Sequence, residues 1–279
     1  MIRTSDAVWR TILPWPRADT HKHQRGRLGV VCGPALRTGA ARLAARAGLR
    51  IGAGVVHILC PPDASLIVAA STTAIMVDEF ASPEVLARLA EPLDAVVIGP
   101  AAGLTESTAQ NLAAVARTGA ALVVDADALT LFRDRPSGLF DHLDRDDVLT
   151  PHEGEFERLF PGLLSRGRET AARSAAERAG AIVVLKGRET IIAGPDGRLS
   201  VNDNGVPWLA TAGSGDVLAG MIGGLIAQRM DSFDAACAAT WMHADAAGRF
   251  GPGLIAEDLP EILPAVLRGL LSGPDQPVF

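Results

Sequence analysis

The chain has 279 residues, of which 48% are hydrophobic and 21% are charged, and this composition supports one large apolar core. Its formal net charge of -6 argues against the basic surface that nucleic-acid-binding proteins carry. No apolar run reaches the ~20 residues of a membrane-spanning helix, and the first residues lack the pattern of a signal peptide. The three cysteines, Cys32, Cys60 and Cys237, have neither metal-ligand nor redox spacing. We therefore expect a cytoplasmic protein that binds neither nucleic acid nor membrane and acts on a small molecule.

The chain begins with a predicted extended arm, residues 1–25, in which Pro14 and Pro16 stand near Trp9 and Trp15. From residue 28 onward, short β-branched apolar runs alternate with Ala- and Leu-rich amphipathic stretches, as in βαβ units. Strands apolar on both faces, as a helix-covered parallel sheet requires, are predicted at residues 28–32, 55–59, 95–98, 121–124, 148–149 and 181–185. Helices are predicted between them at residues 38–49, 106–118, 153–160 and 169–179.

The next part of the chain has a different pattern. Residues 190–193 and 199–201 flank the turn Gly194-Pro195-Asp196-Gly197, which predicts a β-hairpin at the edge of the sheet. Helices follow at residues 216–227, 233–249 and 256–271, and we expect them to pack along one face of the sheet. The sequence thus predicts a single α/β domain over residues 26–279 with a central, mostly parallel sheet.

A glycine-rich turn, Gly213-Ser214-Gly215, leads into an apolar helix that begins at Asp216. The unpaired N–H groups and the positive dipole end of that helix favour an anion at this point. Asp216 is suited to be a general base beside such an anion. The alternative is an ordinary glycine-containing loop in which Asp216 only satisfies the first helical turn. Gly220, Gly223 and Gly224 instead indicate close helix packing.

Other polar residues follow the predicted strands, at the edge where open α/β folds bind ligands. Asp125 and Asp127 would position Mg²⁺ or cap the next helix. His152 and Glu155 start a helix, where Glu155 has the alternative of being a plain N-terminal carboxylate. Lys186 ends a strand, and its alternative is an ordinary side chain that extends to solvent. His57 and His243 are interpreted as packing histidines.

The turn resembles the anion hole of ribokinase-like kinases, and the longer segment 210–220 resembles ADP- or ATP-dependent NAD(P)H-hydrate dehydratases. Further segments agree with that family in the same order along the chain: His21-Lys22, Gly26-Arg27, and residues 39–41, 52–54, 125–129, 150–156, 185–187 with Thr190, and 253–259. The resemblance covers about residues 20 to 271. It implies a ribokinase-like, three-layer α/β/α fold.

The resemblance also implies nicotinamide-nucleotide repair: removal of water from the S epimer of NADHX or NADPHX, with Mg²⁺ and usually ADP in bacteria, giving AMP and phosphate. Asp216 would be the catalytic base and a substrate contact, and Glu155 would reach Mg²⁺ through water. The nucleotide contacts would be Lys186, Gly187, Arg188, Glu189, Thr190, Gly213, Ser214 and Gly215. The further substrate contacts would be Ala40, Gly103 and His152. Here Ala101 or Ala102 stands where the family usually has glycine.

Two other readings remain at this point. A ribokinase-like kinase of a small alcohol, such as a thiazole or pyrimidine precursor, would share the anion hole, but His152 and the Lys186-Gly187 loop differ from those kinases. A nucleotide-binding sensor without turnover would have no need of Asp216. Many bacterial relatives carry an epimerase domain, so we expect either a separate epimerase acting in trans or spontaneous epimerisation of R-NADHX. Relatives often form tetramers, and Trp9 and Trp15 would contribute to an interface unless they pack on their own chain.

Overall fold

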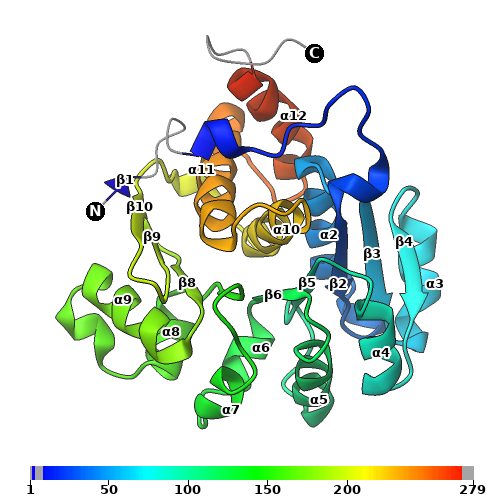
Figure 1. Cartoon of the computed structure of the whole chain (residues 1–279), viewed down its shortest axis with the longest axis horizontal. Helices are drawn as coiled ribbons and strands as arrows, with labels where there is room; N and C mark the ends of the chain where they lie inside the picture. The colour runs from blue at the N-terminus through cyan, green and yellow to red at the C-terminus, as the bar shows by residue number, and fades with distance from the viewer. Residues whose placement is uncertain (1, 4–8, 272–279) are drawn as a thin grey trace.

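The structure is a computed structural model that describes residues 2–3 and 9–271. Within these residues, one ten-stranded sheet crosses the molecule (Figure 1). Neighbouring strands are parallel except for β9, which is antiparallel to β8 and β10. In order across the sheet, the strands are β1 (Ile2–Arg3), β10 (Leu199–Asn202), β9 (Thr190–Ala193), β8 (Ile182–Leu185), β7 (Val148–Leu149), β6 (Ala121–Val124), β5 (Ala95–Ile98), β2 (Arg27–Val31), β3 (Val55–Cys60) and β4 (Met76–Glu79).

The six strands predicted as buried are present, with bounds within one residue of those expected. Their continuous apolar runs are explained by helices on both faces of the sheet. The predicted hairpin is also confirmed as β9 and β10, with β1 beyond it in the described chain. β4 was not predicted. It is an edge strand whose residues are half-buried or exposed, so it has no apolar run to mark it.

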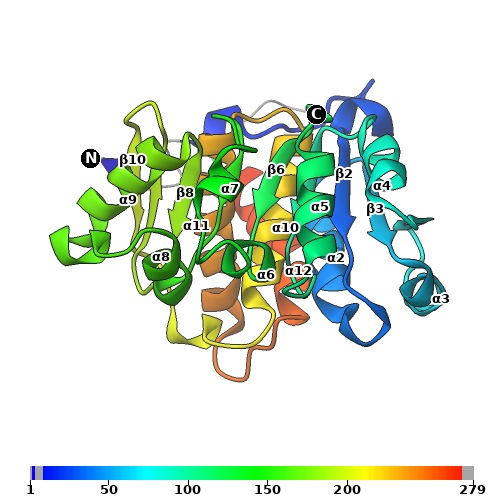
Figure 2. The same cartoon turned by 90° about the horizontal axis from the view of Figure 1, so that it is seen from below.

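Helices form a layer on each side of the sheet (Figures 1 and 2). The longer helices are α2 (Gly39–Ile51), α3 (Pro62–Ser71), α4 (Pro83–Ala90), α5 (Glu106–Val115), α8 (Glu153–Leu159), α9 (Arg168–Ala179), α10 (Ser214–Ala227), α11 (Ser232–Phe250) and α12 (Asp258–Leu271). The short ones are α6 (Asp127–Thr130), α7 (Ser137–Phe140), η1 (Arg10–Ile12), η2 (Lys22–Arg25), η3 (Ala35–Arg37), η4 (Leu163–Arg166) and η5 (Pro207–Leu209). None of the described helices is long and apolar enough to cross a membrane.

The two helical layers enclose two apolar clusters. One lies between the sheet and α2, α10, α11 and α12, and the other lies between the sheet and α4 to α9. The expectation that the three C-terminal helices share one face is therefore confirmed. α10 packs closely on α2, because a methyl group on Gly220 would lie 2.1 Å from the Ala44 carbonyl oxygen. Gly224 also packs on α2, and Gly223 packs on strand residues of the sheet, so Gly220, Gly223 and Gly224 serve close packing as predicted.

The N-terminal segment packs on α11 and α12. The Trp9 ring is fully buried and its centroid lies 5.3 Å from that of Trp241. Arg10 Nε donates to the Leu270 carbonyl at 2.8 Å. The expectation that Trp9 is exposed for an interface is therefore wrong, because its own chain covers it; Trp15 also packs against this core and is only partly exposed.

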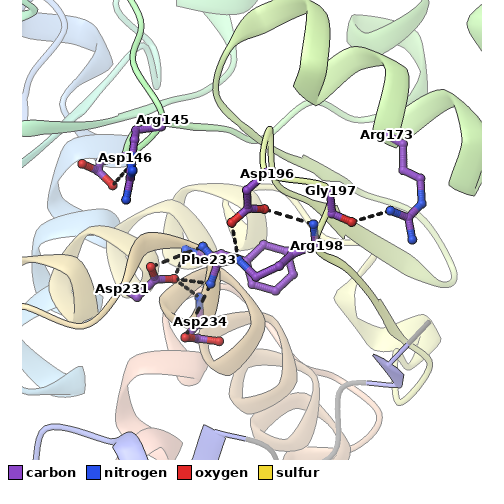
Figure 3. Close-up of polar contacts among 9 residues, drawn as sticks. All are labelled: Arg145, Asp146, Arg173, Asp196, Gly197, Arg198, Asp231, Phe233 and Asp234. Carbon is purple, nitrogen blue, oxygen red and sulfur yellow. Dashed lines mark hydrogen bonds and ion pairs between the residues drawn. The ribbon is translucent and has the colours of Figure 1, made fainter.

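The turn of the β9–β10 hairpin is fixed to the start of α11 by one arginine (Figure 3). Arg198 donates to Asp196 Oδ2 at 2.7 Å and to Asp231 Oδ1 at 2.8 Å. Its guanidinium carbon also lies 4.5 Å above the centre of the Phe233 ring. These carboxylates raise the pKa of Arg198 although burial opposes them, so the arginine stays charged. The cluster lies at the end of the hairpin opposite Thr190 and Asn202.

Candidate functional site

Side chains from three neighbouring parallel strands meet at one edge of the sheet. Asp125 follows β6, His152 follows β7 and Lys186 follows β8. A parallel β-bridge between His152 and Lys186 continues the pairing of β7 with β8 beyond their ends. Because the carboxyl ends of parallel strands lie at the same edge, this is where an open α/β sheet forms its ligand site.

The glycine-rich turn faces this edge. Gly213 has φ 88° and caps α10, and a methyl group there would lie 2.7 Å from Leu43 Cδ1 and 2.9 Å from Ala256 Cβ, so only glycine fits. Ser214 Oγ donates to the Leu209 carbonyl at 2.8 Å. The first amides of a helix have no intrahelical partner, although the Ser214 N–H donates to the Thr211 carbonyl at 3.4 Å. The turn has the conformation of an anion site, and anion binding there stays a prediction.

A buried ion pair lies beside the turn. Lys186 Nζ is 2.9 Å from Asp125 Oδ1, and the Asp125 side chain is 3% exposed. A methyl group on Gly215 would lie 3.4 Å from Lys186 Nζ and 3.8 Å from Asp125 Oδ2. Burial alone would lower the pKa of Lys186, but the charges of Asp125, Glu155 and Asp216 raise it. Lys186 is thus a permanent cation within a group of carboxylates.

Asp216 is the third residue of α10 and lies close to this pair. Burial raises the pKa of Asp216 to about 6; the negative charge of Asp125 adds to the increase, and the positive charge of Lys186 opposes it. A carboxylate with such a pKa is still ionised at neutral pH and binds a proton more readily than an ordinary aspartate. Both properties suit a general base.

His152 and Glu155 form a capping box at the start of α8. His152 Nδ1 accepts from the Gly154 N–H at 2.9 Å, and Glu155 Oε2 accepts from the His152 N–H at 2.9 Å. The alternative considered for Glu155, a carboxylate at a helix N-terminus, is therefore one of its roles. Burial raises the pKa of Glu155 although the His152 N–H and Lys186 oppose the increase.

The fit to Mg²⁺ follows from these contacts. Among the described residues, no group of three or more histidine, cysteine, aspartate or glutamate side chains is arranged to hold a metal ion. One oxygen of Glu155 is already occupied by the helix cap. Mg²⁺ commonly keeps several waters and uses one or two carboxylates together with substrate phosphates. The residues therefore fit a phosphate-bound Mg²⁺ that Glu155 would contact through water.

A cavity of about 960 Å³ lies on one side of the turn. It joins most of the predicted nucleotide contacts: Lys186, Gly187, Arg188, Thr190, Ser214 and Gly215, together with His152. Glu189 and Gly213 do not line it. Glu189 is exposed on the β8–β9 loop, and Gly213 lies behind the turn against Leu43.

Arg168 organises the β8–β9 loop and was missed by sequence reasoning. Its Nη2 donates to the Glu189 carbonyl at 2.9 Å and to the Leu185 carbonyl at 3.3 Å, and its Nη1 pairs with Glu153. A methyl group on Gly187 would lie 2.5 Å from Nη2. An arginine at a helix start carries no sequence signal for this contact, because the loop it holds lies some twenty residues further along the chain.

The predicted substrate contacts are divided between two places. Gly103 lines a separate cavity of about 460 Å³, and its N–H donates to Asp127 Oδ2 at 2.9 Å. Asp127 therefore orients the Gly103 loop. Ala101 adopts φ 54°, so this loop bends in the left-handed region although alanine stands there. Ala40 is the second residue of α2 and lines neither of these cavities.

Both packing histidines have partners. His57 Nδ1 lies 2.6 Å from Asp78 Oδ2 in the neighbouring strand. His243 Nε2 lies 2.9 Å from the Ser214 carbonyl, and burial lowers the pKa of His243 to about 4, so the neutral ring donates this bond. The packing interpretation is confirmed, although His243 also lines the 960 Å³ cavity, which the sequence did not indicate.

Several known proteins are similar to this chain in sequence. A model of the NAD(P)H-hydrate dehydratase family matches residues 28–263. The bifunctional NAD(P)H-hydrate repair enzyme of Salinibacter ruber is 36% identical over 94% of this chain and 52% of that protein. The enzyme of the same name from Gloeobacter violaceus is 41% identical over 85% and 48%. The chain spans about half the length of the curated relatives it matches.

A solved structure extends the comparison to three dimensions. The ADP/ATP-dependent NAD(P)H-hydrate dehydratase of Bacillus subtilis, co-crystallised with ATP and Mg²⁺, superposes with a TM-score of 0.84 at 28% identity. The match covers 96% of this chain and 98% of that one. It confirms the three-layer, ribokinase-like fold that the sequence resemblance implied.

Proposed function

Because the chain belongs to the NAD(P)H-hydrate dehydratase family, we propose that it dehydrates the S epimer of NADHX and NADPHX, with ADP as the phosphoryl donor. The observation that carries this proposal is the placement of Asp216, a carboxylate whose pKa is raised to about 6, beside the amides of the Gly213–Gly215 turn. A general base and an anion site lie together there, as transfer of a phosphoryl group to a hydroxyl requires.

The reaction has two steps. The ring hydroxyl of the hydrated nicotinamide attacks the terminal phosphorus of ADP, Asp216 accepts the hydroxyl proton, and the bond to AMP breaks. The phosphorylated ring then loses phosphate together with a ring proton, which leaves the reduced dinucleotide. Hydroxide is a poor leaving group, and phosphorylation replaces it with a better one. The balance is hydrated dinucleotide plus ADP giving reduced dinucleotide, AMP, hydrogen phosphate, which carries the ring proton, and the one proton that Asp216 accepts and then releases.

The surrounding residues have supporting roles in this proposal. The amides of Ser214 and Gly215 stabilise the transferred phosphoryl group, and the 187–190 loop holds the rest of the nucleotide. Mg²⁺, when bound, would neutralise charge on the phosphates, and Glu155 would hold it through water. His152 would contact the substrate from the wall of the nucleotide cavity, and Gly103 would contact it from the separate 460 Å³ cavity. Ala40, at the start of α2, would complete that substrate surface.

The physiological setting is also a proposal. We propose a cytoplasmic homo-oligomer that receives the S epimer from an epimerase acting in trans. Its three cysteines are free and buried, in keeping with a reducing compartment.

The test is an assay with the purified protein, S-NADHX and Mg²⁺, run with ADP, with ATP and with no nucleotide. We expect recovery of reduced-nicotinamide absorbance with ADP, accompanied by equal amounts of AMP and phosphate. Recovery with ATP and not ADP would correct the donor and keep the dehydratase. If neither nucleotide restores absorbance while a small alcohol is phosphorylated, the kinase reading replaces this one.

A further inference from the structure

Asn202, the last residue of β10, forms part of the wall of the 960 Å³ cavity. Asn202 is buried, with only 2% of the residue exposed. In the β9–β10 pairing, Asn202 lies opposite Thr190, one of the predicted nucleotide contacts. No sequence signal marks this asparagine, which stands directly after the predicted strand 199–201 in a short polar segment.

Two neighbouring hydrogen bonds fix the orientation of the Asn202 amide. Asn204 Nδ2 donates to the Trp241 carbonyl at 3.1 Å, which leaves Asn204 Oδ1 as an acceptor. Asn202 Nδ2 donates to that oxygen at 2.7 Å. A flipped Asn202 amide would place two oxygens against each other, so Oδ1 is the atom directed away from Asn204.

Asn202 Oδ1 is buried and has no hydrogen-bond partner among the described residues. Buried carbonyl oxygens almost always have a partner in folded proteins, because an unpaired one has lost its hydration without replacement. Because the unpaired Asn202 Oδ1 belongs to the wall of a ligand cavity, it points to a hydrogen-bond donor on the bound ligand.

The chemistry of the cavity identifies that donor. The lining includes Ser214 and Gly215 of the anion turn, and it also includes apolar side chains, among them Val206, Leu209 and Ala244. An apolar wall suits a flat base. The ring nitrogens of adenine that are free in a nucleotide are acceptors, so its 6-amino group is the one donor of the base.

We infer that Asn202 Oδ1 accepts a hydrogen bond from the 6-amino group of the adenine base, which makes Asn202 the residue that selects an adenine nucleotide. This inference rests on the proposed function for the presence of an adenine nucleotide in the cavity. It adds a specificity residue from β10 to the contacts expected from the 187–190 loop and the 213–215 turn.

The test measures dissociation constants for the full chain, by titration calorimetry, with three nucleotides. These are ADP, purine-riboside 5′-diphosphate, which lacks only the 6-amino group, and 2′-deoxy-ADP. We expect the wild-type protein to bind ADP about tenfold more tightly than the purine analogue. Equal affinities for these two would overturn the inference without any variant being needed.

Two variants then test whether Asn202 Oδ1 is the atom that produces the preference for ADP over the purine analogue. In Asn202→Leu, which keeps the size of the side chain and removes the acceptor, we expect the affinity for ADP to fall to that of the purine analogue. Asn111→Leu is the matched control, because Asn111 is also a buried asparagine with an unpaired Oδ1 but lines the other cavity. It should keep the tenfold preference.

Three further results, all from the variants, would contradict the inference. Asn202→Leu could weaken ADP and the analogue equally, which would make Asn202 purely structural. Asn202→Leu could weaken the binding of ADP but leave the binding of 2′-deoxy-ADP unchanged, which would assign the lost contact to the ribose 2′-hydroxyl. Asn111→Leu could also abolish the preference. Failure of the dehydratase assay with an intact amino-group preference would remove the proposed function and keep the inference, so the two outcomes can be told apart.

Discussion

Lys186 Nζ lies 2.9 Å from Asp125 Oδ1, beneath the turn that carries Asp216. The two charges of this pair act on Asp216 in opposite directions: Asp125 raises its pKa and Lys186 lowers it. Burial of Asp216 is the largest cause of its raised pKa. The pair adjusts that pKa further, from a buried position that bulk solvent screens little.

The first prediction concerns pH. A base with a pKa of about 6 should give a kcat/KM that falls as the pH drops through this value, since protonated Asp216 cannot accept the substrate proton. In Asp125→Asn the charge that raises the pKa is gone and Lys186 loses its partner, and both changes lower the pKa of Asp216. The acid limb of the profile should move to lower pH, even if the maximum rate also falls.

The control for this measurement is Asp134→Asn. Asp134 is an exposed carboxylate that pairs only with its neighbour Arg133 in the described structure, and its removal should leave the acid limb in place. An acid limb in Asp125→Asn that stays put or moves to higher pH would show that Asp125 does not act on the base in this way.

The second prediction concerns Arg168, whose guanidinium donates to three carbonyls at the end of β8 and in the β8–β9 loop. Arg168→Ala should raise the KM for the nucleotide about tenfold and change kcat little, because lost charge-assisted hydrogen bonds disorder the binding loop and leave Asp216 in place. Steady-state kinetics with varied nucleotide measure this. Arg173→Ala on the same helix, which frees the Gly197 carbonyl at the other end of the hairpin, should not change this KM; an equal increase would point to a general loosening of α9.

The third prediction concerns stability. Arg198→Ala should lower the free energy of unfolding by about 1 kcal/mol, since the network it joins is partly exposed and several charges depend on it. Denaturant unfolding at low and high salt measures it, and the loss should shrink at high salt. Catalytic rate should not change. Arg145→Ala, which removes a largely exposed pair with Asp146, should cost less than half as much; equal losses would mean that the Arg198 network adds nothing of its own.

The fourth prediction concerns backbone strain next to Asp125. Ala126 has φ 51° and ψ -118°, a region that residues with a Cβ rarely occupy. Ala126→Gly should therefore raise the free energy of unfolding by about 1 kcal/mol. Ala128→Gly, a buried helical alanine nearby, should lower it by about the same amount or more. A stability loss in Ala126→Gly would contradict the assigned strain.

The sequence predicted the parts of the fold that leave a local pattern. Buried parallel strands such as β5 and β6 are continuous apolar runs, and the 213–215 turn has glycines directly before an apolar helix. β4 and α3 were not predicted, because an edge strand and its flanking helix need no regular apolar spacing. α4 was also missed, although Ser82 and Pro83 mark its start and it has an apolar face. The burial of Trp9 was also missed, since its partner Trp241 lies more than two hundred residues away.

In the candidate site, too, residues with a local sequence pattern were predicted and contacts between distant residues were not. Lys186 and Asp125 were found because each follows a strand, but their pairing depends on β6, β7 and β8 lying side by side in the sheet. The contacts of Arg168 and the unpaired oxygen of Asn202 arise from side-chain geometry alone. Residues of this kind have no spacing or composition that a single sequence could reveal.

The most direct test of the central claim is the dehydration rate of Asp216→Asn with S-NADHX, ADP and Mg²⁺. We predict a loss in kcat of about 10² to 10⁴-fold, the usual contribution of a general base, with the dissociation constant for ADP nearly unchanged. The variant should be at least as stable as the wild type at neutral pH, because a carboxylate whose pKa is raised on folding disfavours the folded state once it ionises. Turnover within a few-fold of wild type would contradict the assignment of Asp216 as the base.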